Sequence, residues 1–238
     1  MKKQLKSFIH SFGWDLRRLS PASHPTTQLL SALNYVKANI VFDVGSNIGQ
    51  FSQELRSVGY VGKIISFEPL TSAHASLCQA AKHDPRWVVH PRTAVGDTNG
   101  EVMINIAGNS VSSSVLPMLE AHSSAAVNSA YISSEIASLV RLDSVSGQYL
   151  DSSSRVFLKI DTQGYEWQVL NGAEELLKIT YGIMLEMSLT PLYGNQYLWL
   201  DTIRRLEALG FTLWSVQSGF TDMRTGRTLQ VDGIFLRE

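Results

Sequence analysis

The sequence of 238 residues lacks most of the features of secreted, membrane-spanning and zinc-binding proteins. Cys78 is the only cysteine, so the chain can form neither an intrachain disulfide nor a cysteine-based zinc cluster. No apolar run approaches the roughly 18 to 20 residues that a membrane-spanning helix needs, and no signal-peptide pattern is present. These absences predict a cytoplasmic protein in a reducing compartment.

Charge is also scarce. Charged residues make up 17% of the chain, and the formal net charge is -1. A nucleic-acid partner is therefore not expected, because such partners select a basic face. The six histidines show no metal-ligand spacing such as H-E-x-x-H. A hydrophobic content of 44% is ordinary for one large domain with a full core.

The N-terminus is the one place where composition shifts. Apolar side chains recur there at helical spacing among basic ones, namely Leu5, Phe8, Ile9 and Phe12 among Lys2, Lys3, Lys6, Arg17 and Arg18. We expect residues 1–37 to form a helical extension and residues 38–238 the main domain. The basic helix could lie on an anionic membrane surface at its inner face. We favour the alternative that it folds back on the domain with its charges in solvent.

Beyond residue 38, short β-branched runs alternate with segments of helical length. The expected strands are 39–44, 63–68, 87–90, 155–160, 182–187 and 211–216, and the expected helices are 48–58, 71–82, 165–178 and 198–209. This alternation predicts a doubly wound α/β fold with a mostly parallel sheet, since each parallel pairing needs a crossover. Two further strand candidates, 101–107 and 136–142, interrupt the pattern.

Two segments have a distinct composition. The last residues read as strand, turn and strand, with "TGR" as the tight turn of an antiparallel hairpin at a sheet edge. The serine- and alanine-rich segment 110–134 is expected to be a loop or a loosely helical cover near a site, and it contains His122 as a candidate base.

The stretch "VFDVGSNIGQF" lies at the end of the first expected strand, where ligands bind in open α/β sheets. Gly45 and Gly49 permit close approach to the backbone, and Asn47 tolerates a left-handed conformation. The spacing lacks the middle glycine of the dinucleotide fingerprint, which disfavours NAD. Asp43 would repel a pyrophosphate but could accept the amino group of an amino acid.

The second and third strand ends complete this cofactor site. Glu68, followed by Pro69, stands where an acidic side chain accepts hydrogen bonds from both ribose hydroxyls of a nucleoside. Asp97 follows the third strand and could meet an adenine amine, or belong to a plain polar turn. A nucleoside with an amino-acid tail is S-adenosyl-L-methionine. In the alternative interpretation, Glu68 only caps a helix and Asp43 only pairs with a neighbour.

The motifs "FDVGSNIGQFS", "SFEP", "TAVGD", "VRLDSV", "FLKIDTQGYEWQVLNGA" and "LEMSLTPLY" occur in the order and spacing of the FkbM family of S-adenosylmethionine-dependent methyltransferases. Residues 38 to 236 resemble this family. The resemblance implies a class I methyltransferase fold with strand order 3-2-1-4-5-7-6, and O-methylation of a hydroxyl, often on a sugar or a natural product. The family commonly has Glu at the position of Gln163 and often His at that of Tyr165.

Catalytic groups are expected at the later strand ends. Side chains alternate along a strand, so Lys159 and Asp161 should share one face. We predict Asp161 as the general base or acceptor-positioning carboxylate, with Lys159 orienting it. Glu166 could instead stabilise the first turn of the next helix. Tyr193, Tyr197 and Trp199 could form a sugar-stacking wall or belong to the core.

Glu186 ends the fifth expected strand in an otherwise apolar run, where an uncompensated carboxylate is costly. It could share a proton with Asp161, pair with Lys159, or join Asp161 in holding a divalent cation. A metal would lower the pKa of the acceptor hydroxyl.

Three functions are compatible with these features. The first is an O-methyltransferase that acts on a small molecule or a glycan. The second is an RNA methyltransferase, which would need a basic stripe with interleaved aromatic residues. The third is a non-catalytic module that binds a glycan or a partner. The sequence indicates neither the acceptor nor the oligomeric state.

Overall fold

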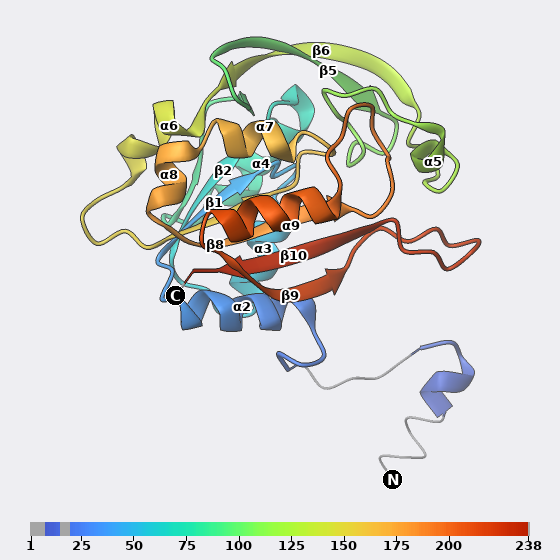
Figure 1. The fold of residues 1–238 in the computed structure, drawn as a ribbon, viewed down its shortest axis with the longest axis horizontal. Helices are drawn as coiled ribbons and strands as arrows, with labels where there is room; N and C mark the ends of the chain where they lie inside the picture. The colour runs from blue at the N-terminus through green and yellow to red at the C-terminus, as the bar shows by residue number, and fades with distance from the viewer. Residues whose placement is uncertain (1–7, 15–19, 238) are drawn as a thin grey trace.

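A seven-stranded sheet forms the centre of the computed structural model, which describes residues 8–14 and 20–237. The strand order is β3-β2-β1-β7-β8-β10-β9 (Figure 1). The bounds are β1 Ile40–Val44, β2 Lys63–Phe67, β3 Trp87–Val89, β7 Val156–Ile160, β8 Thr180–Ser188, β9 Thr212–Ser218 and β10 Gln230–Leu236. Within this sheet, the antiparallel pairs are those of β10 with β8 and with β9, and the other neighbouring strands are parallel. The doubly wound, mostly parallel fold and its antiparallel C-terminal hairpin are confirmed.

Helices cover both faces of this sheet (Figure 1). One face carries α2 Pro25–Tyr35, α3 Gln50–Ser57 and α4 Thr71–Ala81, and the other carries α7 Glu166–Asn171, α8 Glu174–Lys178 and α9 Trp199–Ala208. Each face has its own apolar cluster, and β1 contributes to both: Val41 packs on the α2 side and Phe42 on the α7 side. Strands buried on both faces read as continuous apolar runs, which is why the sequence locates them well.

A second, smaller sheet stands beside the first and has the order β4-β6-β5. Its strands are β4 Ala94–Val95, β5 Gly100–Ala107 and β6 Tyr131–Val140. The two additional strand candidates therefore pair with each other, antiparallel, and are not members of the central sheet. The expected bounds 136–142 were wrong, because β6 begins at residue 131 and takes the end of the serine-rich segment into the ladder with β5. The rest of that segment is loop with the short helix α5, Glu120–Ser123.

The segment 165–178 is two short helices and not the single helix expected. Gly172 separates α7 from α8, and a Cβ on it would lie 1.8 Å from the carbonyl oxygen of Gly96. Its backbone also accepts a hydrogen bond from the amide of Asp143. The chain changes direction here because another backbone segment passes against it.

The N-terminal part of the chain is described in two pieces. Residues 8–11 are helical, while the expected basic residues at positions 2, 3, 6, 17 and 18 lie outside the described residues. In α2, Leu29 and Leu33 pack into the apolar cluster of the central sheet. The division at residue 37 into two units stays a prediction. None of the described helices is long and apolar enough to cross a membrane.

Candidate active site

A cavity of about 620 Å³ opens at the carboxyl ends of β1, β2, β7 and β8. Its wall includes Asn47 after β1, Glu68 after β2, Asp161 after β7 and Glu186 in β8. Residues 110–115 of the serine-rich segment and His122 line another side, as expected of a cover near a site. Ligands bind at this end of open α/β sheets, so the position agrees with the fold.

Glu68 is a buried carboxylate in the cavity wall. Its Oε2 accepts a hydrogen bond from the amide of Asn47 at 2.8 Å, and its Oε1 accepts one from the amide of Leu70 at 2.9 Å. Burial raises the pKa of Glu68 to about 7, although these two donors favour the ionised form. Each oxygen keeps a lone pair for a further donor. The buried Oδ1 of Asn47 also has no hydrogen-bond partner in the part of the chain described.

The two glycines of the first strand end serve packing. Gly45 has φ of 77°, and a Cβ on it would lie 1.8 Å from the carbonyl oxygen of Asp161. Gly49 begins α3 with φ of 92°, and a Cβ there would lie 2.8 Å from the ring of Trp87. Gly45 lines the cavity, while the close neighbour of Gly49 is Trp87.

Asp43 is fully buried behind this turn. Its Oδ1 lies 3.1 Å from Nζ of Lys159, and its Oδ2 accepts a hydrogen bond from Ser52 at 3.0 Å. Lys159 also donates to the carbonyl of Gly45 at 2.9 Å. Burial opposes the charge on Lys159, but the carboxylates of Asp43 and Asp161 outweigh it and raise its pKa. Asp43 thus pairs with Lys159, and through Lys159 it stabilises the turn that begins at Gly45.

Gln163 joins the two candidate catalytic carboxylates. Its Nε2 donates to Oδ1 of Asp161 at 2.8 Å and to Oε2 of Glu186 at 3.0 Å. Asp161 also lies 3.7 Å from Nζ of Lys159, and 42% of its side chain is exposed. Glu186 is half-buried, and desolvation together with the nearby charge of Asp161 raises its pKa well above the ordinary value. Asp161 is thus the more accessible carboxylate of the pair.

The same glutamine connects to the opposite wall. Tyr193 donates from its hydroxyl to Oε1 of Gln163 at 2.8 Å, and that hydroxyl lies 3.2 Å from Nε2 of His122. Ser114 donates to the backbone carbonyl of Gln163 at 2.6 Å. Gln163 has φ of 54°, a conformation rare for a non-glycine residue, and these contacts hold it there.

Glu166 is also buried, and it stabilises the turn between β7 and α7. Its Oε1 accepts hydrogen bonds from the amides of Thr162 at 2.9 Å and Gly164 at 3.0 Å. Burial raises the pKa of Glu166 to about 7. This geometry agrees with the helix-start interpretation.

Several expected residues lie elsewhere. Asp97 is outside the cavity lining, and its backbone carbonyl accepts a hydrogen bond from Arg141 at 2.7 Å. Tyr193 is fully buried, and Tyr197 stacks on Trp167 at 3.8 Å between ring centroids. Neither Tyr197 nor Trp199 lines the cavity. Pro69, by contrast, does line it.

Sequence reasoning missed Asp232 and Gln230, which β10 brings into the cavity wall. Burial raises the pKa of Asp232 to about 7. A single acidic residue in the apolar strand "VDGIFL" was an available signal, of the same kind that identified Glu186.

The described residues of the cavity wall show no evident set of ligands for a divalent cation. Among the described residues, no group of three or more His, Cys, Asp or Glu side chains is placed to hold a metal ion. Asp161 and Glu186, the two metal ligands considered from sequence, share the amide of Gln163 as donor. Coordination of a metal by this pair stays an untested alternative.

The donors and acceptors at the first two strand ends fit S-adenosyl-L-methionine. Glu68 presents free acceptor capacity for ribose hydroxyls, and the unpartnered Oδ1 of Asn47 can accept a further hydrogen bond. The sheet order and this site define a class I methyltransferase that uses S-adenosyl-L-methionine. The model of the methyltransferase FkbM domain matches residues 43–213, well over half of the chain. The chain therefore belongs to the FkbM methyltransferase family.

Comparisons with individual proteins show only distant similarity. No curated protein matches the chain in sequence. TehB from Haemophilus influenzae aligns in structure with a TM-score of 0.46 and 7% identity, covering 89% of this chain but only 62% of that protein.

Two further solved structures are similarly distant. The methyltransferase domain of bacterial CtHen1 gives a TM-score of 0.47 and 11% identity over 91% of this chain and 100% of that domain. A putative RNA methyltransferase from Pyrococcus horikoshii gives a TM-score of 0.44 and 12% sequence identity, over 89% of this chain and 82% of that protein chain. Likenesses of this size indicate nothing about the acceptor of this chain.

Proposed function

We propose that the protein transfers a methyl group from S-adenosyl-L-methionine to a hydroxyl of a sugar, a glycan or a natural product. The observation that carries the proposal is the carboxylate pair Asp161 and Glu186, which Gln163 holds at the cavity wall beside the cofactor strands. The cofactor supplies an activated methyl group on a sulfonium. The protein must align an acceptor oxygen with it and take up the proton of that oxygen.

Each residue of the pair has a distinct role in this proposal. Asp161 is partly exposed and accepts the hydroxyl proton, and Nζ of Lys159 lies 3.7 Å from its carboxylate. Gln163 fixes the carboxylate by donating to it, and its own carbonyl is fixed by Tyr193. Glu186 is half-buried, has a raised pKa and positions the amide of Gln163 by accepting its hydrogen bond.

The two alternative functions are less well supported. The cavity wall carries the carboxylates of Glu68, Asp161, Glu186 and Asp232, an arrangement that disfavours a phosphate backbone as acceptor. A non-catalytic module has no need of a buried Glu68 with free lone pairs in the wall of a ligand-sized cavity. An RNA acceptor would require a basic surface, which this cavity wall does not provide.

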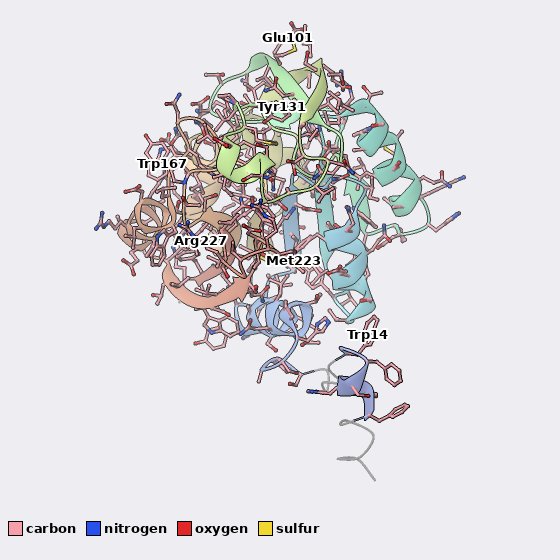
Figure 2. The ribbon with its side chains drawn as sticks, turned by 90° about the vertical axis from the view of Figure 1, so that its right-hand side faces the viewer. Trp14, Glu101, Tyr131, Trp167, Met223 and Arg227 are labelled. Carbon is pink, nitrogen blue, oxygen red and sulfur yellow. The ribbon has the colours of Figure 1, made fainter. Side chains whose placement is uncertain are left out.

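We also propose that the N-terminal segment contacts an anionic membrane surface from the cytoplasmic side. Phe8, Phe12 and Trp14 are 63%, 67% and 74% exposed, and the rings of Phe8 and Phe12 are in edge contact. Figure 2 shows Trp14 beside the short N-terminal helix, at the opposite end of the view from Glu101. Exposed aromatic side chains within a basic segment are typical of interfacial anchors.

Two measurements test the methyltransferase proposal. Calorimetry with S-adenosylhomocysteine should show micromolar binding, and radiolabelled methyl transfer should label cell-envelope sugars. In Asp161→Asn we expect turnover to fall by about 10² to 10⁴, the usual contribution of a general base, with cofactor affinity unchanged. Asp201→Asn, on the exposed first turn of α9, is the matched control. Unchanged turnover in Asp161→Asn would remove this residue from the mechanism.

A further inference from the structure

The cavity extends beyond Asp161 across two more strands, and its wall there is acidic. Glu186 in β8 and Asp232 in β10 are direct register partners, so their side chains lie on the same face of the sheet. Adjacent strands lie about 4.8 Å apart, which puts β10 about 10 Å from β7. Glu186 and Asp232 therefore extend the acidic wall of the cavity beyond Asp161, across β8 and β10.

The negative charge of this extension has little compensation within the described part of the chain. Asp232 has no hydrogen bond or ion pair to a described side chain, and Gln163 is the one described donor to Glu186. The nearest cation, Lys159, is already held by Asp43 and by the carbonyl of Gly45. Two carboxylates directly opposite one another destabilise a sheet unless something neutralises them. Burial, and after it the nearby charge of Asp161, raises the pKa of both carboxyl groups.

Two buried groups in the cavity wall are also without partners among the described residues. Gln230, two residues before Asp232 on the same face of β10, is 2% exposed, and its Nε2 has no acceptor. His122 is also 2% exposed, and its Nδ1 has no partner. Buried polar atoms without a hydrogen bond cost free energy, so their persistence in a cavity wall points to a ligand that completes them.

We propose that this extension is an acceptor subsite for a hydroxyl compound that carries a protonated amino group, such as a hexosamine unit. The ammonium lies between Glu186 and Asp232, to which it can donate three hydrogen bonds, and Gln230 donates to a neighbouring oxygen of the acceptor. Phosphate and carboxylate groups are repelled by the same carboxylates. The inference rests on the proposed methyltransferase function, because it names the acceptor class of that site.

Paired sugar probes test the subsite. The full chain is saturated with S-adenosylhomocysteine, and binding of glucosamine and galactosamine is compared with that of glucose and galactose by ligand-observed NMR. We expect at least one hexosamine to bind about tenfold more tightly than its parent hexose, as one charge-assisted contact allows. Glucose 6-phosphate should bind more weakly than glucose. Asp232→Asn should abolish the preference without changing affinity for S-adenosylhomocysteine, and Asp201→Asn should retain it.

The outcomes separate the two proposals. Equal binding of amine and parent sugar, or binding of neither, overturns the subsite while binding of S-adenosylhomocysteine leaves the methyltransferase assignment intact. A preference that survives in Asp232→Asn overturns it as well. Failure of the wild-type protein to bind S-adenosylhomocysteine instead counts against the proposed function. The comparison of sugars on the wild-type chain decides the question even where Asp232→Asn does not fold.

Discussion

Burial of Glu68 changes the pKa of the residue that is expected to bind the ribose hydroxyls. Two backbone amides hold its carboxylate at the cavity wall, and burial raises its pKa to about 7. Ribose hydroxyls donate to the ionised form better than to the protonated form. Binding of the cofactor should therefore lower this pKa and release a proton. The affinity gained from Glu68 is fully present above its pKa and is lost as the pH falls through about 7.

We therefore expect Glu68→Gln to lower affinity for S-adenosylhomocysteine about tenfold or more at pH 8, since hydrogen bonds to a charged acceptor are worth roughly 1.5–3 kcal/mol. Calorimetry between pH 6 and pH 8 measures this. Wild-type affinity should rise with pH, and the rise should be smaller in the variant. Glu101→Gln, an exposed position on β5, is the control. A variant with wild-type affinity and wild-type pH dependence would exclude Glu68 as the ribose ligand.

Residues at strand ends could be predicted from the sequence because their position depends on local pattern. An apolar run followed by a turn places Asp43, Glu68 and Asp161 at one edge of a parallel sheet. The contacts that each of these side chains makes were harder to predict. Asp43 contacts Lys159, a residue distant in sequence, and not the cavity. Asp232 depends on the antiparallel register of β10 with β8, which no local pattern specifies.

At the scale of elements, the break between α7 and α8 depends on one close backbone contact. Gly172 lies against the carbonyl of Gly96, which directly follows β4 of the small sheet. We expect Gly172→Ala to lower the free energy of unfolding by about 1–3 kcal/mol, the usual cost of overpacking a rigid neighbour. Urea denaturation measures the change. Gly147→Ala is the matched control, since a Cβ at Gly147 meets no atom within 4 Å. Equal stability of both variants would show that the backbone can yield at this contact.

The same contact explains why periodicity did not predict this break. Residues 165–178 have a helical apolar pattern, and both α7 and α8 bury apolar side chains against the central sheet. The interruption comes from the passage of Gly96, which lies more than seventy residues earlier. Likewise, β5 and β6 alternate as ordinary strands, but nothing local in them indicates that they form a separate sheet. Local patterns locate elements, while long-range contacts determine their interruptions and partners.

At the scale of the whole molecule, charge is divided unevenly. The first 19 residues hold five Lys or Arg and one Asp, a net charge of +4. Because the chain totals -1, residues 20–238 carry -5. An anionic surface therefore attracts the N-terminal segment and repels the body, so contact should be made through the segment alone.

Vesicle co-sedimentation of the full chain tests this orientation. We expect binding to phosphatidylcholine vesicles that contain phosphatidylglycerol, little binding to phosphatidylcholine alone, and a steep loss with salt, because each Lys or Arg near an anionic surface contributes about 1 kcal/mol. Replacing Phe8, Phe12 and Trp14 together with Ser should reduce binding at least about tenfold, since apolar burial and charge act jointly. Met223→Ser removes an exposed apolar side chain from the distant C-terminal hairpin and should have no effect. Undiminished binding by the triple variant would contradict anchoring through this segment.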